Sequence, residues 1–279
     1  MSKLRGLEGK NAIVTGGAKG QGLSHVLALA DAGCDVAVLD VVAPVEGAYP
    51  LATAEMMEAT ITAVEERGVR SLGLPCDVRD EGQVEAAVSK ALAFFDGRID
   101  ILVNNAAVGL AGSIQEIRAE DVDLVLDTNV RGPILVTKYV APAMIAARFG
   151  KIINISSGVT AAGVANLSPY VASKHAVNGL TNAWAMELAE FGINVNAVSP
   201  PTIRPGGGQG SGMLTALAGQ FGMTPEEAYE ELSAQQNMPG PKWRGESRHI
   251  SDAVLFLASD NADQITGQVL AADCGMSAR

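Results

Sequence analysis

Short apolar runs alternate with segments of helical periodicity along most of this chain of 279 residues. The runs are apolar at consecutive positions, as in strands that are buried on both faces. We expect strands over Asn11–Thr15, Asp35–Leu39, Arg70–Leu74, Ile99–Val103, Lys151–Ile155, Asn194–Val198 and Gly267–Ala271. We expect helices over Leu23–Ala32, Thr53–Arg67, Asp80–Phe95, Ser168–Glu190 and Ile250–Ser259, and two helices or one bent helix over Glu120–Arg148. This alternation predicts an α/β fold with a seven-stranded parallel sheet covered by helices on both faces.

Two segments interrupt the alternation. The first, Val41–Ala52, follows the second strand and contains two prolines and a glycine. The second extends from Pro200 to about Arg248, is rich in glycine and proline, and contains a helical stretch over Pro225–Gln236. Long loops within a compact domain are usually functional or disordered. No linker marks a boundary, so we expect one domain over residues 1–279, with an insertion at about 41–52 and a lid at about 202–248.

The charge of the chain limits its partners. The formal net charge is −11 and no basic cluster interrupts it, which excludes nucleic acid and anionic membranes as partners. The N-terminus lacks the apolar core of a signal peptide, and no long uncharged run could span a bilayer. The three cysteines are far apart, show no metal-ligand spacing and fit a reducing compartment. We therefore expect a cytoplasmic protein without a metal site.

A glycine-rich turn joins the first strand to the first helix. The sequence T-G-G-A-K-G-Q-G places Gly16, Gly20 and Gly22 where the backbone can turn tightly and approach a phosphate. The N-terminus of the following helix offers free N–H groups and the positive end of its dipole to a pyrophosphate. The glycine spacing differs from the common G-x-G-x-x-G pattern, but the position between strand and helix is typical of dinucleotide binding.

An acid at the end of the second strand bears on the choice of dinucleotide. Asp40 is placed to accept hydrogen bonds from an adenosine ribose, and its carboxylate would repel a 2′-phosphate. It therefore favours NAD over NADP. Lys19, within the glycine-rich turn, argues the other way, because a cation there could attract that phosphate. We give Asp40 the greater weight because a strand end fixes its position.

A tyrosine and a lysine lie four residues apart in the helix predicted over Ser168–Glu190. Tyr170 and Lys174 therefore share one helix face. A free phenol has a pKa of about 10, and a nearby ammonium group would draw this pKa toward neutrality. A serine at the end of the strand Lys151–Ile155 can donate a hydrogen bond to a carbonyl or alcohol oxygen. These groups suit proton transfer to or from an alcohol that exchanges a hydride with a cofactor.

The sequence resembles the short-chain dehydrogenase/reductase family along essentially its whole length. The matching motifs are T-G-G-A-K-G-Q-G, C-D-V at 76–78, N-N-A-A at 104–107, T-N-V around Asn129, S-S-G at 156–158, Y-V-A-S-K at 170–174 and I-T-G at 265–267. The resemblance implies a Rossmann-type, doubly wound sheet. The family has glycine where this chain has Ala107 and Pro201, so the surroundings of the cofactor differ at these two positions.

The resemblance also implies roles for individual residues. Tyr170 would be the acid–base, and Lys174 would lower its pKa and hold the nicotinamide ribose. Ser157, rather than Ser156, would orient the substrate oxygen, and Asn129 would interrupt its helix and hold a water that relays protons to Lys174. Asp77 and Val78 would contact the adenine, Asn105 the adenosine side, and Thr202 and Ile203 the nicotinamide carboxamide. The expected cofactor-binding residues are Gly16, Lys19, Gly20, Gln21, Gly22, Asp40, Asp77, Val78, Asn105, Ala106, Tyr170, Lys174, Thr202 and Ile203.

A closer resemblance concerns the first insertion. The motif G-Q-G-L-S-H, an acid ending the second strand, and A-P-V-E-G-A-Y-P-L-A-T are similar to the carveol-dehydrogenase-like, mycofactocin-coupled branch of the family. This similarity implies that the insertion folds over bound NAD and slows its exchange, so that a redox partner reoxidises the cofactor in place. The family resemblance further implies a homotetramer built from long helices such as 121–148 and 168–190.

The lid is apolar at several positions. These are Met213, Leu214, Leu217, Phe221, Met223, Met238 and Trp243. They suit a nonpolar substrate such as a terpenoid or alicyclic alcohol, and they suit equally the packing face of a lid helix. Three other functions compete with this alcohol dehydrogenase: an NADPH-dependent reductase of 3-oxoacyl thioesters, a non-catalytic dinucleotide sensor and a sugar-nucleotide epimerase. Asp40 and the lack of a basic docking patch weigh against the thioester reductase. The intact set of Asn129, Ser157, Tyr170 and Lys174 weighs against the sensor, and the lack of a further substrate domain weighs against the epimerase.

Overall fold

The computed structural model describes residues 4–206, 208, 210–234, 238 and 245–278. Within these residues, seven strands form one sheet in the order β3-β2-β1-β4-β5-β6-β7, and every neighbouring pair is parallel. The strands are β1 (Asn11–Thr15), β2 (Asp35–Asp40), β3 (Ser71–Pro75), β4 (Ile101–Asn104), β5 (Gly150–Ile155), β6 (Ile193–Ser199) and β7 (Val269–Ala271). The doubly wound sheet predicted from the sequence is confirmed. Its order reverses between β1 and β4, which places a crevice at the carboxyl ends of these strands.

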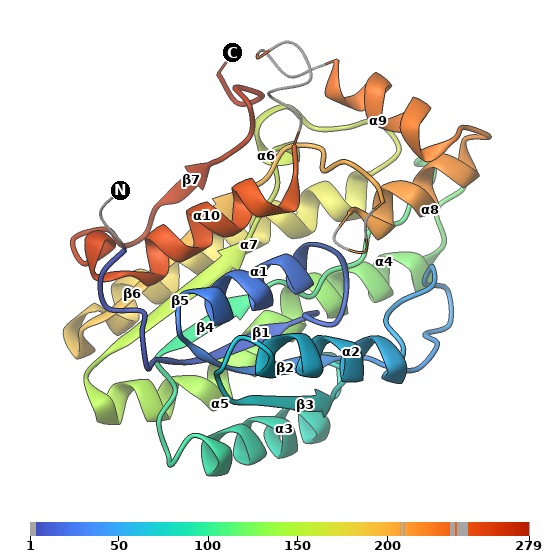
Figure 1. Ribbon diagram of the computed structural model, residues 1–279. Helices are drawn as coiled ribbons and strands as arrows, with labels where there is room; N and C mark the ends of the chain where they lie inside the picture. The colour runs from blue at the N-terminus through green and yellow to red at the C-terminus, as the bar shows by residue number, and fades with distance from the viewer. Residues whose placement is uncertain (1–3, 207, 209, 235–237, 239–244, 279) are drawn as a thin grey trace.

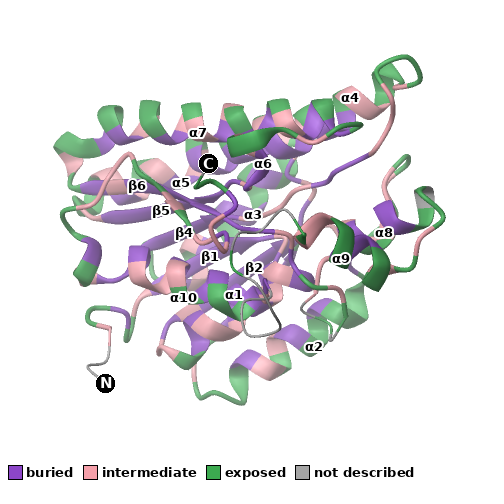
Figure 2. Cartoon of the chain, turned by 90° about the horizontal axis from the view of Figure 1, so that it is seen from above, coloured by how far each residue is buried: buried purple, intermediate pink, exposed green. Residues whose placement is uncertain are grey.

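Helices cover both faces of the sheet (Figure 1). Those in the described part of the chain are α1 (Gly20–Asp31), α2 (Ala54–Glu65), α3 (Glu81–Phe94), α4 (Ala119–Leu126), α5 (Gly132–Ala147), α6 (Val159–Ala162), α7 (Ser168–Leu188), α8 (Gly212–Gln220), α9 (Pro225–Ser233) and α10 (Ser247–Ala258). Seen from above, α1, α2 and α10 lie on one side of the buried strands and α3, α5 and α7 on the other (Figure 2). None of the described helices is long and apolar enough to cross a bilayer.

The core is divided by the sheet into two layers of apolar side chains. One layer joins α1, α2 and α10 to the sheet through residues such as Val26, Met57 and Val254. The other joins α3, α5 and α7 to the opposite face through residues such as Val88 and Val140. Because both faces are covered, the central strands are buried along their whole length, which explains their unbroken apolar sequences.

The segment predicted as two helices or one bent helix contains a π-helical turn. It consists of α4, the turn η1 (Asp127–Arg131) and α5, without a break in the chain. One wider turn rotates the helix that follows it, and such turns are frequent at functional sites. The prediction of an interruption near Asn129 is therefore confirmed.

The second long loop is more helical than the sequence predicts. Its first helix, α8, had no predicted bounds, although a lid helix was one interpretation of its apolar residues, and α9 ends at Ser233 instead of Gln236. A capping box, in which Thr224 and Glu227 exchange hydrogen bonds, fixes the start of α9. Gln235, Gln236 and Trp243 lie outside the described residues. The helix α10 begins at Ser247, three positions before the predicted start.

Candidate functional site

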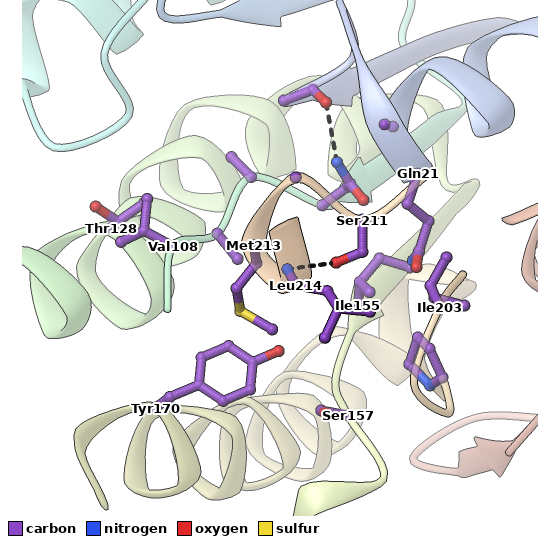
Figure 3. A pocket seen from close by; sticks show the side chains of 18 of the residues that line it. Gln21, Val108, Thr128, Ile155, Ser157, Tyr170, Ile203, Ser211, Met213 and Leu214 are labelled. Carbon is purple, nitrogen blue, oxygen red and sulfur yellow. Dashed lines mark hydrogen bonds between the residues drawn. The ribbon is translucent and has the colours of Figure 1, made fainter. Parts of the chain in front are cut away.

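A cavity of about 270 Å³ lies at the carboxyl ends of β1, β2, β4, β5 and β6. It extends from the glycine-rich turn to the N-terminal part of α7, and residues of the insertion and of α8 also line it. Figure 3 shows Ser157 and Tyr170 on one side of the cavity and Gln21 with Ile203 on another. With one exception, Asn129, every predicted catalytic or cofactor-binding residue lines this cavity.

The glycine-rich turn has the conformation that its glycines allow. Gly16 and Gly20 have φ angles of +64° and +60°, which side-chain-bearing residues rarely adopt. A Cβ atom on Gly22 would clash with the carbonyl oxygen of Gly16, so the turn closes only with glycine at this position. No side chain caps the N-terminus of α1 in the structure, and the N–H of Gly20 donates to the carbonyl of Gly208 at 2.8 Å. The remaining N–H groups of this first turn suit an anionic ligand.

Two charged groups near the turn bear on the choice of dinucleotide. The buried Asp40 accepts a hydrogen bond from the backbone N–H of Ala18 at 2.9 Å, and burial raises its pKa to about 6. The Lys19 ammonium group donates to the carbonyl of Pro50 at 3.0 Å. Both Lys19 and Asp40 line the cavity. The ammonium group of Lys19, which argued for NADP, is paired with the insertion, whereas Asp40, which argues for NAD, faces the cavity from the end of β2.

Sequence reasoning did not identify Arg79, a further cation at this end of the cavity. Its guanidinium group binds both carboxylate oxygens of Asp77, with the shortest contact at 2.6 Å. Burial raises the pKa of Asp77, but the hydrogen bonds and the charge of Arg79 outweigh burial, and the pKa is lowered. The paired Arg79 is thus a weaker attraction for a 2′-phosphate than a free arginine would be. Its position next to C-D-V is the signal that could have identified it.

The end of β4 is tied to the end of β1 beside the turn. The side-chain amide of Asn105 donates to the carbonyl oxygens of Thr15 at 3.0 Å and Gly16 at 3.1 Å. The Thr15 hydroxyl accepts from the backbone N–H groups of Asn105 and Ala106. These bonds hold the glycine-rich turn against β4, and Ala107 follows them in the cavity wall. Asn105 therefore shapes this part of the cavity mainly through the backbone.

Ser157, Tyr170 and Lys174 converge at the other end of the cavity. The hydroxyl of the buried Ser156 donates to Asn178 at 2.6 Å, which leaves Ser157 as the serine that hydrogen-bonds to Tyr170. The Lys174 ammonium group lies 5.5 Å from the centre of the Tyr170 ring and donates to the carbonyl of Ile155 at 2.8 Å. Choosing Ser157 over Ser156 thus agrees with the geometry.

Burial has the largest effect on the pKa values of Tyr170 and Lys174. Burial raises the pKa of Tyr170, against the opposing hydrogen bond from Ser157. The same effect lowers the pKa of Lys174 to about 8. In the protein by itself burial has the larger effect on both groups, because removing them from water favours their neutral forms. The lowering of the Tyr170 pKa by Lys174 stays a prediction.

Asn129 lies behind the cavity instead of in its wall. Its amide nitrogen donates to the carbonyl of Val108 at 2.8 Å and to the Ser173 hydroxyl at 3.0 Å. Its amide oxygen accepts from the N–H of Val108, also at 2.8 Å. The side chain therefore fastens the π-helical turn to α7 and to the segment after β4. Thr128, its neighbour, reaches the cavity.

The segment after β6 passes under the same end of the cavity. Pro200 accepts a hydrogen bond from the N–H of Gly158 at 2.8 Å, which joins the ends of β5 and β6. Thr202 and Ile203 line the cavity, and Ile203 pairs with Gly245 in an isolated parallel bridge. The family has glycine where this chain has Pro201, and with proline at this position Thr202 and Ile203 still line the cavity.

The insertion and α8 close the cavity from outside. Val45, Tyr49 and Leu51 of the insertion pack in one apolar cluster with Tyr170 and Met213. Met213 lies beside the Tyr170 ring (Figure 3), where the missing side chain of Gly109 leaves room for it. Burial, and then the neighbouring Tyr170, raise the pKa of Tyr49, so its phenol stays protonated. Sequence reasoning missed Tyr49, although its place in the insertion was a signal.

Known proteins resemble this chain in sequence and in fold. The sequence model of the family described as short chain dehydrogenase matches residues 10–209. An uncharacterized NAD-dependent oxidoreductase of Mycobacterium tuberculosis is 35% identical over 277 residues, 96% of each chain. A 3-oxoacyl-(acyl-carrier-protein) reductase of Staphylococcus aureus is 35% identical over 267 residues, 96% of this chain and 98% of the relative. The crystal structure of carveol dehydrogenase from Mycobacterium avium in complex with NAD has a TM-score of 0.88, 31% identity, and coverage of 98% and 99%. The chain belongs to the short chain dehydrogenase family.

Proposed function

We propose that this protein is an NAD-dependent alcohol dehydrogenase that interconverts a nonpolar secondary alcohol and its ketone. The observation that carries the proposal is the convergence of Ser157, Tyr170 and Lys174 with the glycine-rich turn in one cavity. Asp40 at the end of β2, the uncapped first turn of α1 and the glycine conformations fit a dinucleotide. The NAD-bound relative structure and the NAD-dependent relative support the same cofactor.

The residues of the cavity divide the chemistry between them. NAD, held by the glycine-rich turn and Asp40, would supply the hydride acceptor for the carbinol carbon. Tyr170, as phenolate, takes the hydroxyl proton of the alcohol and becomes a neutral phenol, and Ser157 donates a hydrogen bond to the same oxygen. Lys174, held by Ile155, contributes positive charge near the phenol when it is protonated. Asn129 acts through position, because it fixes α7 against the π-helical turn by way of Ser173.

The substrate end of the cavity supports a nonpolar substrate. Its described wall beyond Ser157 and Tyr170 is mostly aliphatic, with side chains that include Val159, Val164, Leu167, Met213, Leu214 and Leu217. Such a wall favours apolar molecules because burial of their surface contributes about 25 cal/mol per Å². An alicyclic alcohol of the carveol type matches this chemistry, and the structural relative is a carveol dehydrogenase.

The insertion suits the retention of bound NAD. It packs against the apolar cluster beside Tyr170, and Pro50 accepts the hydrogen bond from Lys19 in the glycine-rich turn. Dissociation of the cofactor would require these contacts to break, which lowers the off-rate. We propose that a redox partner reoxidises the retained NADH.

We also propose a homotetramer in which exposed apolar residues such as Ile134 of α5 and Met186 of α7 become buried.

Replacement of Tyr170 by phenylalanine tests the proposed chemistry. Tyr170→Phe should reduce turnover of cyclic secondary alcohols by about 1000-fold or more, since a positioned acid–base contributes 100- to 10,000-fold. NAD binding should be retained, and Tyr139→Phe, which removes a phenol on the surface of α5, should keep full activity. Full activity of Tyr170→Phe would exclude this assignment.

The similarity to the Staphylococcus aureus reductase supports one alternative, reduction of 3-oxoacyl thioesters. The two functions differ in cofactor and substrate. Steady-state rates with NADH and NADPH, each measured with a cyclic ketone and with a 3-oxoacyl thioester, separate them. We expect the preferred pair to be NADH and the cyclic ketone, because the buried Asp40 disfavours a 2′-phosphate.

A further inference from the structure

A buried histidine connects the glycine-rich turn to α10. His25 lies on α1 one turn after Gln21, and its ring is fully buried. Its Nε2 atom lies 3.3 Å from the amide nitrogen of Gln21, and its Nδ1 atom lies 2.9 Å from the Ser251 hydroxyl. The same hydroxyl contacts Ser24 at 2.8 Å and the carbonyl of Ser247 at 3.1 Å. Of this group, only Gln21 lines the cavity.

The hydrogen bonds of this group fix one arrangement of protons. Ser251 has a single hydroxyl proton, which it donates to the carbonyl of Ser247. Its two lone pairs then accept from the Ser24 hydroxyl and from Nδ1–H of His25. A neutral imidazole with its proton on Nδ1 has an acceptor at Nε2. The amide group of Gln21 must therefore direct its NH₂ at His25.

The reverse orientation of the Gln21 amide would lose a hydrogen bond. The amide oxygen would then face Nε2, so Nε2 would carry the proton and Nδ1 would need a donor. The Ser251 proton would have to serve both Nδ1 and the carbonyl of Ser247, which it cannot do. Burial also lowers the pKa of His25 to about 3, so the ring stays neutral and does not donate from both nitrogens.

The orientation of the amide determines what Gln21 presents to the cavity. With its NH₂ directed at His25, the amide oxygen Oε1, for which the described part of the chain shows no hydrogen-bond donor, is an acceptor at the wall. Figure 3 shows the Gln21 side chain entering the cavity beside Ser211 and Ile203. Ile203 is one of the residues expected at the nicotinamide carboxamide. An acceptor here complements an N–H or O–H group on the nicotinamide half of the dinucleotide.

We propose that His25 is a positioning residue that orients Gln21, whose Oε1 accepts a hydrogen bond from the carboxamide or ribose hydroxyl of the bound dinucleotide. This inference rests on the proposed function, because it requires NAD in the cavity. His25 itself does not contact the cofactor. Its influence passes through one hydrogen bond to Gln21, and Ser251 of α10 fixes its proton.

Titration of NADH with variants at these positions tests the proposal. Gln21→Leu should raise the dissociation constant about five- to tenfold, the effect of one lost hydrogen bond. His25→Phe fills the same space without an acceptor and should give a similar increase, and the double variant should give no more than Gln21→Leu alone. Ser251→Ala lies outside the cavity and should also weaken binding, because Nδ1 loses its acceptor.

A dinucleotide analogue identifies the group that Gln21 contacts. In 3-acetylpyridine adenine dinucleotide an acetyl group replaces the carboxamide and removes its N–H. If the carboxamide is the donor, Gln21→Leu should bind this analogue as well as wild type does. If a ribose hydroxyl is the donor, the five- to tenfold difference should persist.

Two results would overturn the inference. His25→Phe and Ser251→Ala could lower the melting temperature yet bind NADH as tightly as wild type, which would mean a purely structural role for His25. Alternatively, the His25→Phe and Gln21→Leu effects could multiply in the double variant, which would mean independent action. Wild-type protein that binds neither NADH nor NAD would refute the proposed function as well.

Discussion

Acidification should destabilise the protein through His25 in particular. Burial lowers the pKa of this imidazole from 6.5 to about 3. Below pH 6.5 the unfolded chain therefore binds a proton at this position that the folded protein does not bind. The free energy of unfolding must then fall as the pH decreases from 6.5 toward 3.

The size of this effect follows from the two pKa values. Each pH unit over which only the unfolded state is protonated reduces the free energy of unfolding by about 1.4 kcal/mol. From pH 7 to pH 5 the loss through His25 is about 2 kcal/mol. Asp40 acts in the opposite direction, because burial raises its folded pKa from 3.8 to about 6. Its contribution over the same range is about 1 kcal/mol of added stability.

Urea unfolding at pH 7 and pH 5 separates the two groups. Wild type and His25→Phe both contain Asp40, so subtracting one pH dependence from the other removes its contribution. Wild type should lose about 2 kcal/mol more than His25→Phe over this range, with similar m-values. His175→Phe, which removes an exposed imidazole, is the matched control. Equal pH dependences for wild type and His25→Phe would refute the argument that His25 is buried and neutral.

Two further substitutions test the cofactor end of the cavity. Lys19→Met removes the hydrogen bond to Pro50 and should increase the NADH dissociation rate about fivefold in stopped-flow fluorescence, whereas Lys90→Met on the surface of α3 should not. An unchanged rate would exclude Lys19 as a restraint on the insertion. Gly22→Ala should reduce the free energy of unfolding by about 2 kcal/mol or more, because its Cβ meets a carbonyl oxygen of the turn. Gly179→Ala has free space and should slightly raise the melting temperature; a Gly22→Ala protein as stable as wild type would contradict the close approach.

Periodicity and turn residues were sufficient to predict the sheet and the helices that cover it. Each strand is buried between two helical layers, so its sequence is apolar at consecutive positions and recognisable without tertiary information. The cavity could also be predicted, because parallel strands bring the residues at their carboxyl ends to one edge. This is why Gly16, Asp40 and Ser157 lie in one cavity although they are far apart in the sequence.

The sequence allowed a lid helix at α8 but could not fix its bounds, because this helix is buried on two sides. Leu217 packs toward Tyr170 and the insertion, whereas Leu214 and Ala218 pack against α9. A helix with two apolar faces lacks the single apolar stripe by which a surface helix is recognised. The sequence left two interpretations of the apolar lid, as a substrate wall and as a packing face. Leu217 lines the cavity and Ala218 packs against α9, so α8 contributes both to the cavity wall and to packing within the lid. That this wall contacts substrate stays a prediction.

The charged residues near the glycine-rich turn bear jointly on the choice between NAD and NADP. The sequence identified Lys19 as a cation that could bind a 2′-phosphate, and the structure adds Arg79 at the same end of the cavity. In the structure, Lys19 is directed at the Pro50 carbonyl and Arg79 is paired with Asp77. Asp40 is buried in the cavity wall, and a second negative charge beside it would raise the cost of its own ionisation. The proposed preference for NAD thus depends on where the cations are held as much as on the acid, and the insertion contributes to it by accepting the hydrogen bond of Lys19.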